Sequence, residues 1–273
     1  FYAAYLAGFV FGPPVAGALT VIADVRFPFL VLGIAVAVSG LTLRGVVVDD
    51  PGRRSMPVSP VDRRVLRRLV RSRRLIAALL VVISFRYSVG VFEPLWATYL
   101  DDLGASTMVV TISLTVFALP MLLIARWAGR LSDTYGPRWT SVLAAAGTVP
   151  LMGAYGYVGA LPVVLAMTIP HGILEAVESP GTQAAVADAA PQQDAAAAQG
   201  LAEAAGSAAA AVGAFTAAPL FAALGAGPAW LIAAATMAVL LATSSALDRP
   251  RRLAAARRPG TEPDAGETAV TLP

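Results

Sequence analysis

The chain has 273 residues, of which 57% are hydrophobic and 14% charged, and its mean hydropathy is +0.70. A soluble domain carries about 25% charged residues, so these charges are too few to cover a soluble surface of this size. The high apolar content also excludes a disordered chain. The composition therefore predicts an all-α polytopic membrane protein, because helices satisfy their own backbone hydrogen bonds in lipid.

The residue types also limit the chemistry. Cysteine is absent, and His171 is the single histidine. A disulfide framework and a thiolate or histidine metal cluster are therefore not expected. The sequence has no phosphate-loop, H-E-x-x-H or G-x-S-x-G motif. We expect no enzyme active site, no cofactor and no metal.

Eight apolar stretches approach the length of about 20 residues that a helix needs to cross a bilayer. In chain order they are residues 1–22, 28–48, 75–99, 107–128, 139–158, 161–186, 196–222 and 227–247. Residues 49–74 form a basic linker after the second span, and residues 248–273 have the composition of a disordered tail. Because Phe1 already lies inside an apolar stretch, we expect that the N-terminus is missing.

Arginine predicts the orientation. Its three groups, at residues 53–74, 126–138 and 249–258, fall on one side of the membrane if eight helices alternate. The positive-inside rule makes that side cytoplasmic. The linker and the C-terminus are thus expected in the cytoplasm of a multi-pass plasma-membrane protein. One connection on this side, residues 188–199, departs from the pattern because it carries two Asp but no Arg.

The second half of the linker reads VDRRVLRRLVRSRRL. Helical spacing would place Val61, Val65, Leu66 and Leu69 on one face and arginines on the other. This pattern predicts an amphipathic helix that lies on anionic lipid headgroups. A polybasic face can also bind nucleic acid, but a segment tethered to eight spans meets lipid first, so no nucleic-acid partner is expected.

The junction of the fourth and fifth spans reads GRLSDTYGPRW. Gly129 and Gly136 permit a tight reversal, and Asp133 can cap the next helix or pair with Arg130 or Arg138. The pattern G-x-L-x-D-x-x-G-x-R resembles the cytoplasmic loop signature of the major facilitator superfamily. That resemblance implies that Asp133 is the acid of a latch that holds one conformation. A plain turn with solvated charges is the alternative.

The first span carries a second motif, GFVFGPPVAG. Gly8, Gly12, Pro13 and Gly17 resemble the fifth-span signature of the proton-coupled drug exporters in that family, although Ala16 replaces a usual glycine. We expect the glycines to share one side of the helix and to form a close seam. The expected neighbour is the family's eighth or eleventh span, which corresponds here to residues 107–128 or 196–222.

Both resemblances together imply a division of the chain. Residues 1–48 would be the last two helices of an N-terminal bundle, and residues 75–247 a C-terminal six-helix bundle, so that about eight of twelve spans are present. The implied function is secondary transport by alternating access, with proton-coupled efflux of lipophilic small molecules. The expected partners are a small-molecule substrate, protons and the lipid bilayer.

Charged residues inside the spans are candidates for this function, because burying charge in lipid is costly. Arg86 and Glu93 lie seven residues apart on the third span and can both face the bundle interior. Glu175 lies one helical turn after His171, which could pair with it. We expect these four side chains to line a cavity or to carry the proton.

Two other functions fit parts of the sequence. A transporter of a polar metabolite or sugar could share the same motifs, and it would line its cavity with more polar groups. A non-transporting membrane scaffold should lack converging charges inside the membrane. The presence of Arg86, Glu93 and Glu175 favours a transporter.

Overall fold

The computed structural model describes residues 2–46 and 63–256. Within these ranges, long helices occupy all eight predicted stretches, and no strand is present. They are α1 (Tyr2–Ile22), α2 (Phe27–Val46), α4 (Arg73–Asp102), α5 (Thr107–Tyr135), α6 (Pro137–Tyr155), α7 (Leu161–Ala189), α8 (Ala195–Leu224) and α9 (Ala226–Ala256). The short helix α3 (Arg63–Leu69) and a 3-10 turn (Gln192–Asp194) complete the described elements.

Five helices in these ranges are long and apolar enough to cross a membrane. They are α4, α5, α7, α8 together with the preceding 3-10 turn, and α9. Helices α1 and α2 contribute the shorter apolar segments Val10–Ile22 and Phe27–Leu43. The predicted all-α polytopic architecture is therefore confirmed, whereas the count of eight spans stays a prediction.

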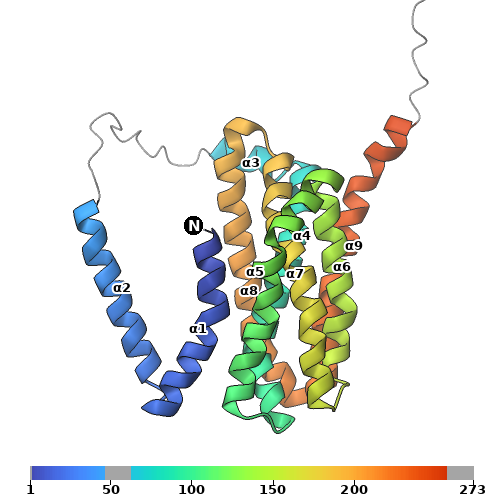
Figure 1. Ribbon diagram of the computed structural model, residues 1–273. Coiled ribbons are helices and arrows are strands. Elements are labelled where there is room, and N and C mark those ends of the chain that lie inside the picture. Colours follow the sequence, from blue (N-terminus) through green and yellow to red (C-terminus); the bar gives the residue numbers. More distant parts are fainter. Residues whose placement is uncertain (1, 47–62, 257–273) are drawn as a thin grey trace, which may run out of the picture.

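Helices α4 to α9 form one bundle, with α4 at its centre (Figure 1). Helix α4 packs most extensively against α8 and α9, while α7 packs between α5 and α6. The core near one end is aromatic and includes Trp96, Tyr155 and Trp230, all almost completely buried. A second cluster of buried side chains lies at the other end, which we call the α3 end because α3 packs there.

Helix α1 lies against α5, one of its two expected neighbours, while α2 stands away from the bundle (Figure 1). The hydroxyl of Thr115 donates to the backbone oxygen of Val10 at 3.0 Å. A Cβ atom at Gly17 would come within 2.9 Å of the Thr111 side chain. This close contact is the seam between the two helices.

The expectation that all three motif glycines share this seam is wrong. A Cβ atom at Gly8 or Gly12 would meet nothing within 4 Å. Val10 and Gly17 are seven residues apart, so they lie on nearly the same side of α1. Gly8 and Gly12 are two residues from Val10 and therefore lie about 200° around the helix from the seam.

Helix α3 differs from the predicted membrane-surface helix. Leu69 is buried in a cluster with Leu75 and Val186, and Val65 packs against the same cluster. The apolar side of α3 therefore contacts the bundle and leaves Arg63 and Arg67 exposed. Val61 lies outside the described residues. The apolar ends of α4, α7 and α8 offer α3 a protein surface on which it can bury the same face without lipid.

The packing of α3 also provides a partner for the acidic connection after α7, residues 188–199. Arg68 of α3 forms an ion pair with Asp194 at 2.5 Å, and the Asp194 side chain is only 5% exposed. A buried carboxylate needs a charged or hydrogen-bonding partner. This connection contains no arginine, and Asp194 within it pairs instead with an arginine of α3.

Replacing Leu69 with serine is expected to release α3 from the bundle. The change removes a buried leucine, whose burial stabilises by about 1.5–3 kcal/mol. Trypsin should then cleave after the arginines of α3 faster than in the wild-type protein. The matched control is Val70→Ser, because Val70 is 47% exposed. Equal digestion of the two variants would mean that the burial of Leu69 does not hold α3.

Two helices extend by more than one turn beyond their predicted ends. Helix α5 continues through the motif to Tyr135, so Gly129 lies inside a helix and Gly136 alone makes the reversal, with φ at +88°. Helix α9 continues to Ala256, into the predicted disordered tail. Arginine and alanine are strong helix formers, which favours this continuation. Residues 257–273 lie outside the described ranges.

Candidate functional site

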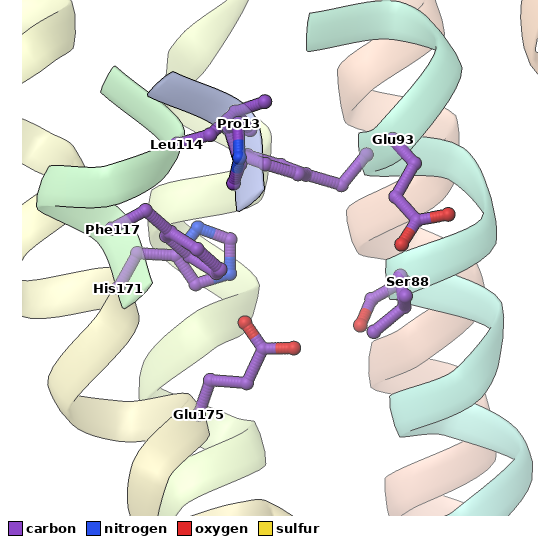
Figure 2. Close-up of a pocket in the computed structure, with 9 residues that line it drawn as sticks. Pro13, Ser88, Glu93, Leu114, Phe117, His171 and Glu175 are labelled. Atoms are coloured by element: carbon purple, nitrogen blue, oxygen red, sulfur yellow. The ribbon is translucent and has the colours of Figure 1, made fainter. Parts of the chain in front are cut away.

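A cavity of about 210 Å³ lies where α1, α4, α5 and α7 meet (Figure 2). It is lined by Pro13, Ser88, Val89, Phe92, Glu93, Leu114, Phe117, His171 and Glu175. Three of the four predicted charged or titratable candidates are therefore brought together, along with the proline of the first-span motif. They come from helices that lie far apart in the sequence.

Close packing of α5 and α7 positions the histidine at this cavity. A Cβ atom at Gly172 would collide with the backbone oxygen of Phe117. Glycine at this position lets α7 approach the backbone of α5 directly. The adjacent residue, His171, is consequently held beside the ring of Phe117, with the ring centroids 5.1 Å apart.

Stacked rings form one wall of the cavity. Phe92 stacks on Phe117 with 5.2 Å between ring centroids, and the imidazole of His171 meets Phe92 edge-on. Such offset and edge-to-face contacts are favoured by the charge distribution of aromatic rings. Phe92 is 5% exposed, so its ring serves both the core and the wall.

The histidine does not pair with Glu175 as the sequence suggested. A hydrogen bond of 3.1 Å instead joins His171 Nδ1 to the hydroxyl of Tyr155 on α6. The backbone oxygen of Tyr155 in turn accepts a hydrogen bond from the hydroxyl of Tyr99. These bonds fix the imidazole against α6 and leave Glu175 directed into the cavity (Figure 2).

Replacing Tyr155 with phenylalanine should destabilise the bundle by about 1–3 kcal/mol, the cost of leaving a buried polar group unsatisfied. His171 is only 4% exposed, so water does not readily replace the lost hydroxyl. The free energy of unfolding in mixed detergent micelles measures the effect. The control is Tyr157→Phe, since Tyr157 is 64% exposed. A loss of equal size in both variants would contradict the assigned hydrogen bond.

Two carboxyl groups reach the cavity from opposite sides. Glu93 projects from α4 and Glu175 from α7, and Ser88 lies below Glu93 on α4 in Figure 2. No arginine is among the lining residues in the described part of the chain. The cavity therefore combines two acidic side chains with apolar and aromatic walls, a setting suited to a positively charged, lipophilic group.

Arg86 lies outside the cavity. Its guanidinium is 3.7 Å from the carboxylate of Glu203 on α8, and both side chains are partly exposed. A Cβ atom at Gly206 would come within 2.9 Å of Arg86 Cγ, so the stem of the arginine packs on α8. Arg86 therefore contacts α8, whereas Glu93 lines the cavity, although the two residues lie seven positions apart on α4.

The junction motif shows different contacts from those expected. Arg138 donates to the backbone oxygen of Ser244 on α9 at 2.9 Å. Helix α6 begins at Pro137 without a side-chain cap. Asp133 and Arg130 are exposed, and neither of the ion pairs found among the described residues includes Asp133. The motif thus joins α6 to α9 through Arg138, while Asp133 faces outward and neither caps α6 nor pairs with Arg138.

Several residues of the site carry no signal in the sequence. Ser88, Leu114 and Phe117 are ordinary span residues, and Tyr155 differs little from other tyrosines near span ends. Their roles depend on which helices become neighbours. Among the described residues, no group of three acidic or histidine side chains has an arrangement that could hold a metal ion.

Comparison with known proteins identifies the family of the chain. The sequence model of the Major Facilitator Superfamily matches residues 78–271, which covers most of the chain and includes α5 to α9. The comparison with curated proteins found no match. The apolar helices and the matched region lead to the same conclusion. The chain belongs to the Major Facilitator Superfamily and is a multi-pass secondary transporter.

Proposed function

We propose that this transporter exports lipophilic small molecules that carry a positively charged nitrogen, in exchange for protons. The observation that carries the proposal is the cavity in which Glu93 and Glu175 lie beside the stacked rings of Phe92 and Phe117. A cation gains from both the carboxylates and the ring faces. A carboxyl group that binds either a proton or the cationic substrate couples the movement of the substrate to the movement of protons.

The first-span motif supports the exporter direction. Pro13 lines the cavity, so the motif that resembles the exporter signature contacts the candidate binding site. A polar metabolite or sugar is the weaker substrate class. Such a ligand needs several hydrogen-bonding partners, whereas Pro13, Val89, Phe92, Leu114 and Phe117 make much of this cavity apolar.

The same proposal divides the helices between two bundles and gives the orientation of the chain in the membrane. Helices α1 and α2 would be the last two helices of an N-terminal bundle, and α4 to α9 the C-terminal bundle. The separation of α2 from the bundle in Figure 1 supports this division. We place the α3 end in the cytoplasm of a plasma-membrane protein, because arginines gather there. Alternating access would then rock the two bundles around the cavity.

Transport by the protein in proteoliposomes tests the proposal. A fluorescent lipophilic cation is enclosed with the protein, and a pH gradient is imposed across the membrane. Dye movement should follow the gradient and stop when a protonophore dissipates it. A neutral analogue of the same dye should move much more slowly. Dye movement that ignores the gradient, or no movement of any cationic dye, would overturn the proposal.

A further inference from the structure

A third carboxyl group lies behind the cavity. Glu178 on α7 is 1% exposed, and its Oε1 atom has no hydrogen-bond partner among the described residues. It does not line the cavity, unlike Glu175, which precedes it by three residues on the same helix. A buried carboxyl with an unpaired oxygen is rare in a folded protein and needs a physical explanation.

The basic side chains on the surrounding helices are engaged elsewhere. Arg86 on α4 pairs with Glu203 on α8, and Arg138 on α6 donates to Ser244 on α9. Neither ion pair found in the described ranges includes Glu178. The other arginines of α4 and α5 are exposed: Arg73, Arg74, Arg126 and Arg130.

The remaining ionisable groups add no positive charge. Glu93 on α4 and Glu175 on α7 line the cavity, and Asp133 on α5 is exposed. The imidazole of His171 bonds to Tyr155. The other ionisable side chains of these helices are the phenols Tyr87, Tyr99 and Tyr135 and the exposed acids Asp101, Asp102 and Asp188.

An ionised carboxylate in this position would be very costly, since burial without a partner removes its hydration and returns nothing. The neutral acid is far less costly to bury. Geometry and charge therefore assign a bound proton to Glu178. The unpaired oxygen is then an available acceptor rather than an unpaired charge.

In the described chain, two unpaired buried groups, Glu178 on α7 and Ser84 on α4, each lie one helical turn from a residue that lines the cavity. On α7, one turn separates Glu178 from Glu175; on α4, one turn separates Ser84 from Ser88, which lines the cavity. Ser84 is 0% exposed, and its hydroxyl oxygen also lacks a partner in the described chain. Both unpaired groups lie one turn from the cavity toward the α3 end, on helices that pack together.

We propose that Glu178 is a second proton-binding site, which exchanges its proton with the cavity through Glu175. When Glu175 has lost its proton to the cavity, the proton of Glu178 moves to the Glu175 carboxylate. Glu178 is a carboxylate only transiently, because Glu175 takes a new proton from the cavity and returns it to Glu178. The role of this site in coupling rests on the proposed proton-coupled export, but its protonation and exchange do not.

Infrared spectroscopy of the protein in lipid tests this site directly. A protonated carboxyl gives its own C=O stretching band, which shifts when deuterium replaces the proton. At neutral pH the wild-type protein should show such a band, and Glu178→Gln should lose it. The matched control Glu203→Gln should keep it, because the Glu203 side chain is 65% exposed. Transfer of the wild-type protein to deuterium oxide should shift the band.

The exchange route is tested with Glu175→Gln. The shift of the Glu178 band should become roughly a hundredfold slower, as expected when an acid–base relay is lost. Three results would overturn the proposal: no band that depends on Glu178, a band that does not exchange, or an exchange rate unchanged in Glu175→Gln. If Glu178→Gln fails to fold, Glu178→Asp keeps the carboxyl and should move the band.

These results separate the site from the transport function. A protein that shows the exchanging band but moves no cationic dye would refute the proposed export and retain the proton site. A protein that moves dye in response to the pH gradient but lacks the C=O band of Glu178 would retain the export function and refute the role of Glu178. The two proposals therefore fail independently.

Discussion

Replacing Gly172 with alanine is expected to destabilise the bundle by at least about 3 kcal/mol, at the upper end of the cost of overpacking. The added Cβ atom would collide with the backbone oxygen of Phe117, and a backbone atom cannot rotate away as a side chain can. Helices α5 and α7 would have to separate. The free energy of unfolding in mixed detergent micelles measures the loss.

The same substitution at Gly200 is the control. Gly200 lies inside α8, and a Cβ atom there would meet nothing within 4 Å. Alanine in an open helical position stabilises by about 0.5–1 kcal/mol relative to glycine. The two substitutions should thus have opposite signs. If Gly172→Ala were as stable as Gly200→Ala, the close crossing of α5 and α7 would not be required.

Replacing Glu175 with glutamine is expected to reduce export of a lipophilic cation about ten- to hundredfold, because a charge-assisted contact of about 1.5–3 kcal/mol is lost. Glutamine keeps the size of the side chain and removes both its charge and its exchangeable proton. Initial rates of dye movement in proteoliposomes, measured under a fixed pH gradient, give the effect.

Two further variants test whether slower export is specific to the carboxyl groups that line the cavity. Glu93→Gln should also slow export of the cation, since Glu93 lines the same cavity. Glu203→Gln should leave the rate close to that of the wild-type protein, because Glu203 pairs with Arg86 outside the cavity. Equal rates for Glu175→Gln and Glu203→Gln would contradict the assignment of Glu175 to the substrate site.

The positions of the long helices could be predicted because they depend on local composition. A span needs only a sufficient run of apolar residues, and each run in this sequence is bounded by charges, prolines or glycines. Helix ends were less predictable. Helix α5 continues to Tyr135 because the polar residues of the junction still form a helix until Gly136 adopts a positive φ.

The candidate site was predicted in part. Glu93, His171 and Glu175 stand out because charged and titratable groups are rare inside spans, and the cavity brings all three together. Their partners could not be found in the same way. The bond from Tyr155 to His171 and the pair of Arg86 with Glu203 each join two helices whose contact is not encoded in either segment alone.

The sequence by itself determined the class of protein, the helical stretches and the rare polar residues within them, since these follow from composition and spacing along one chain. Only the tertiary structure decided what each polar residue does. Glu175 and Glu178 lie three positions apart on α7, yet one faces the cavity and the other is buried with an oxygen that has no partner in the described part of the chain. Their difference arises from the helices packed around them, because neighbouring backbones and side chains set the access to water, charge and substrate.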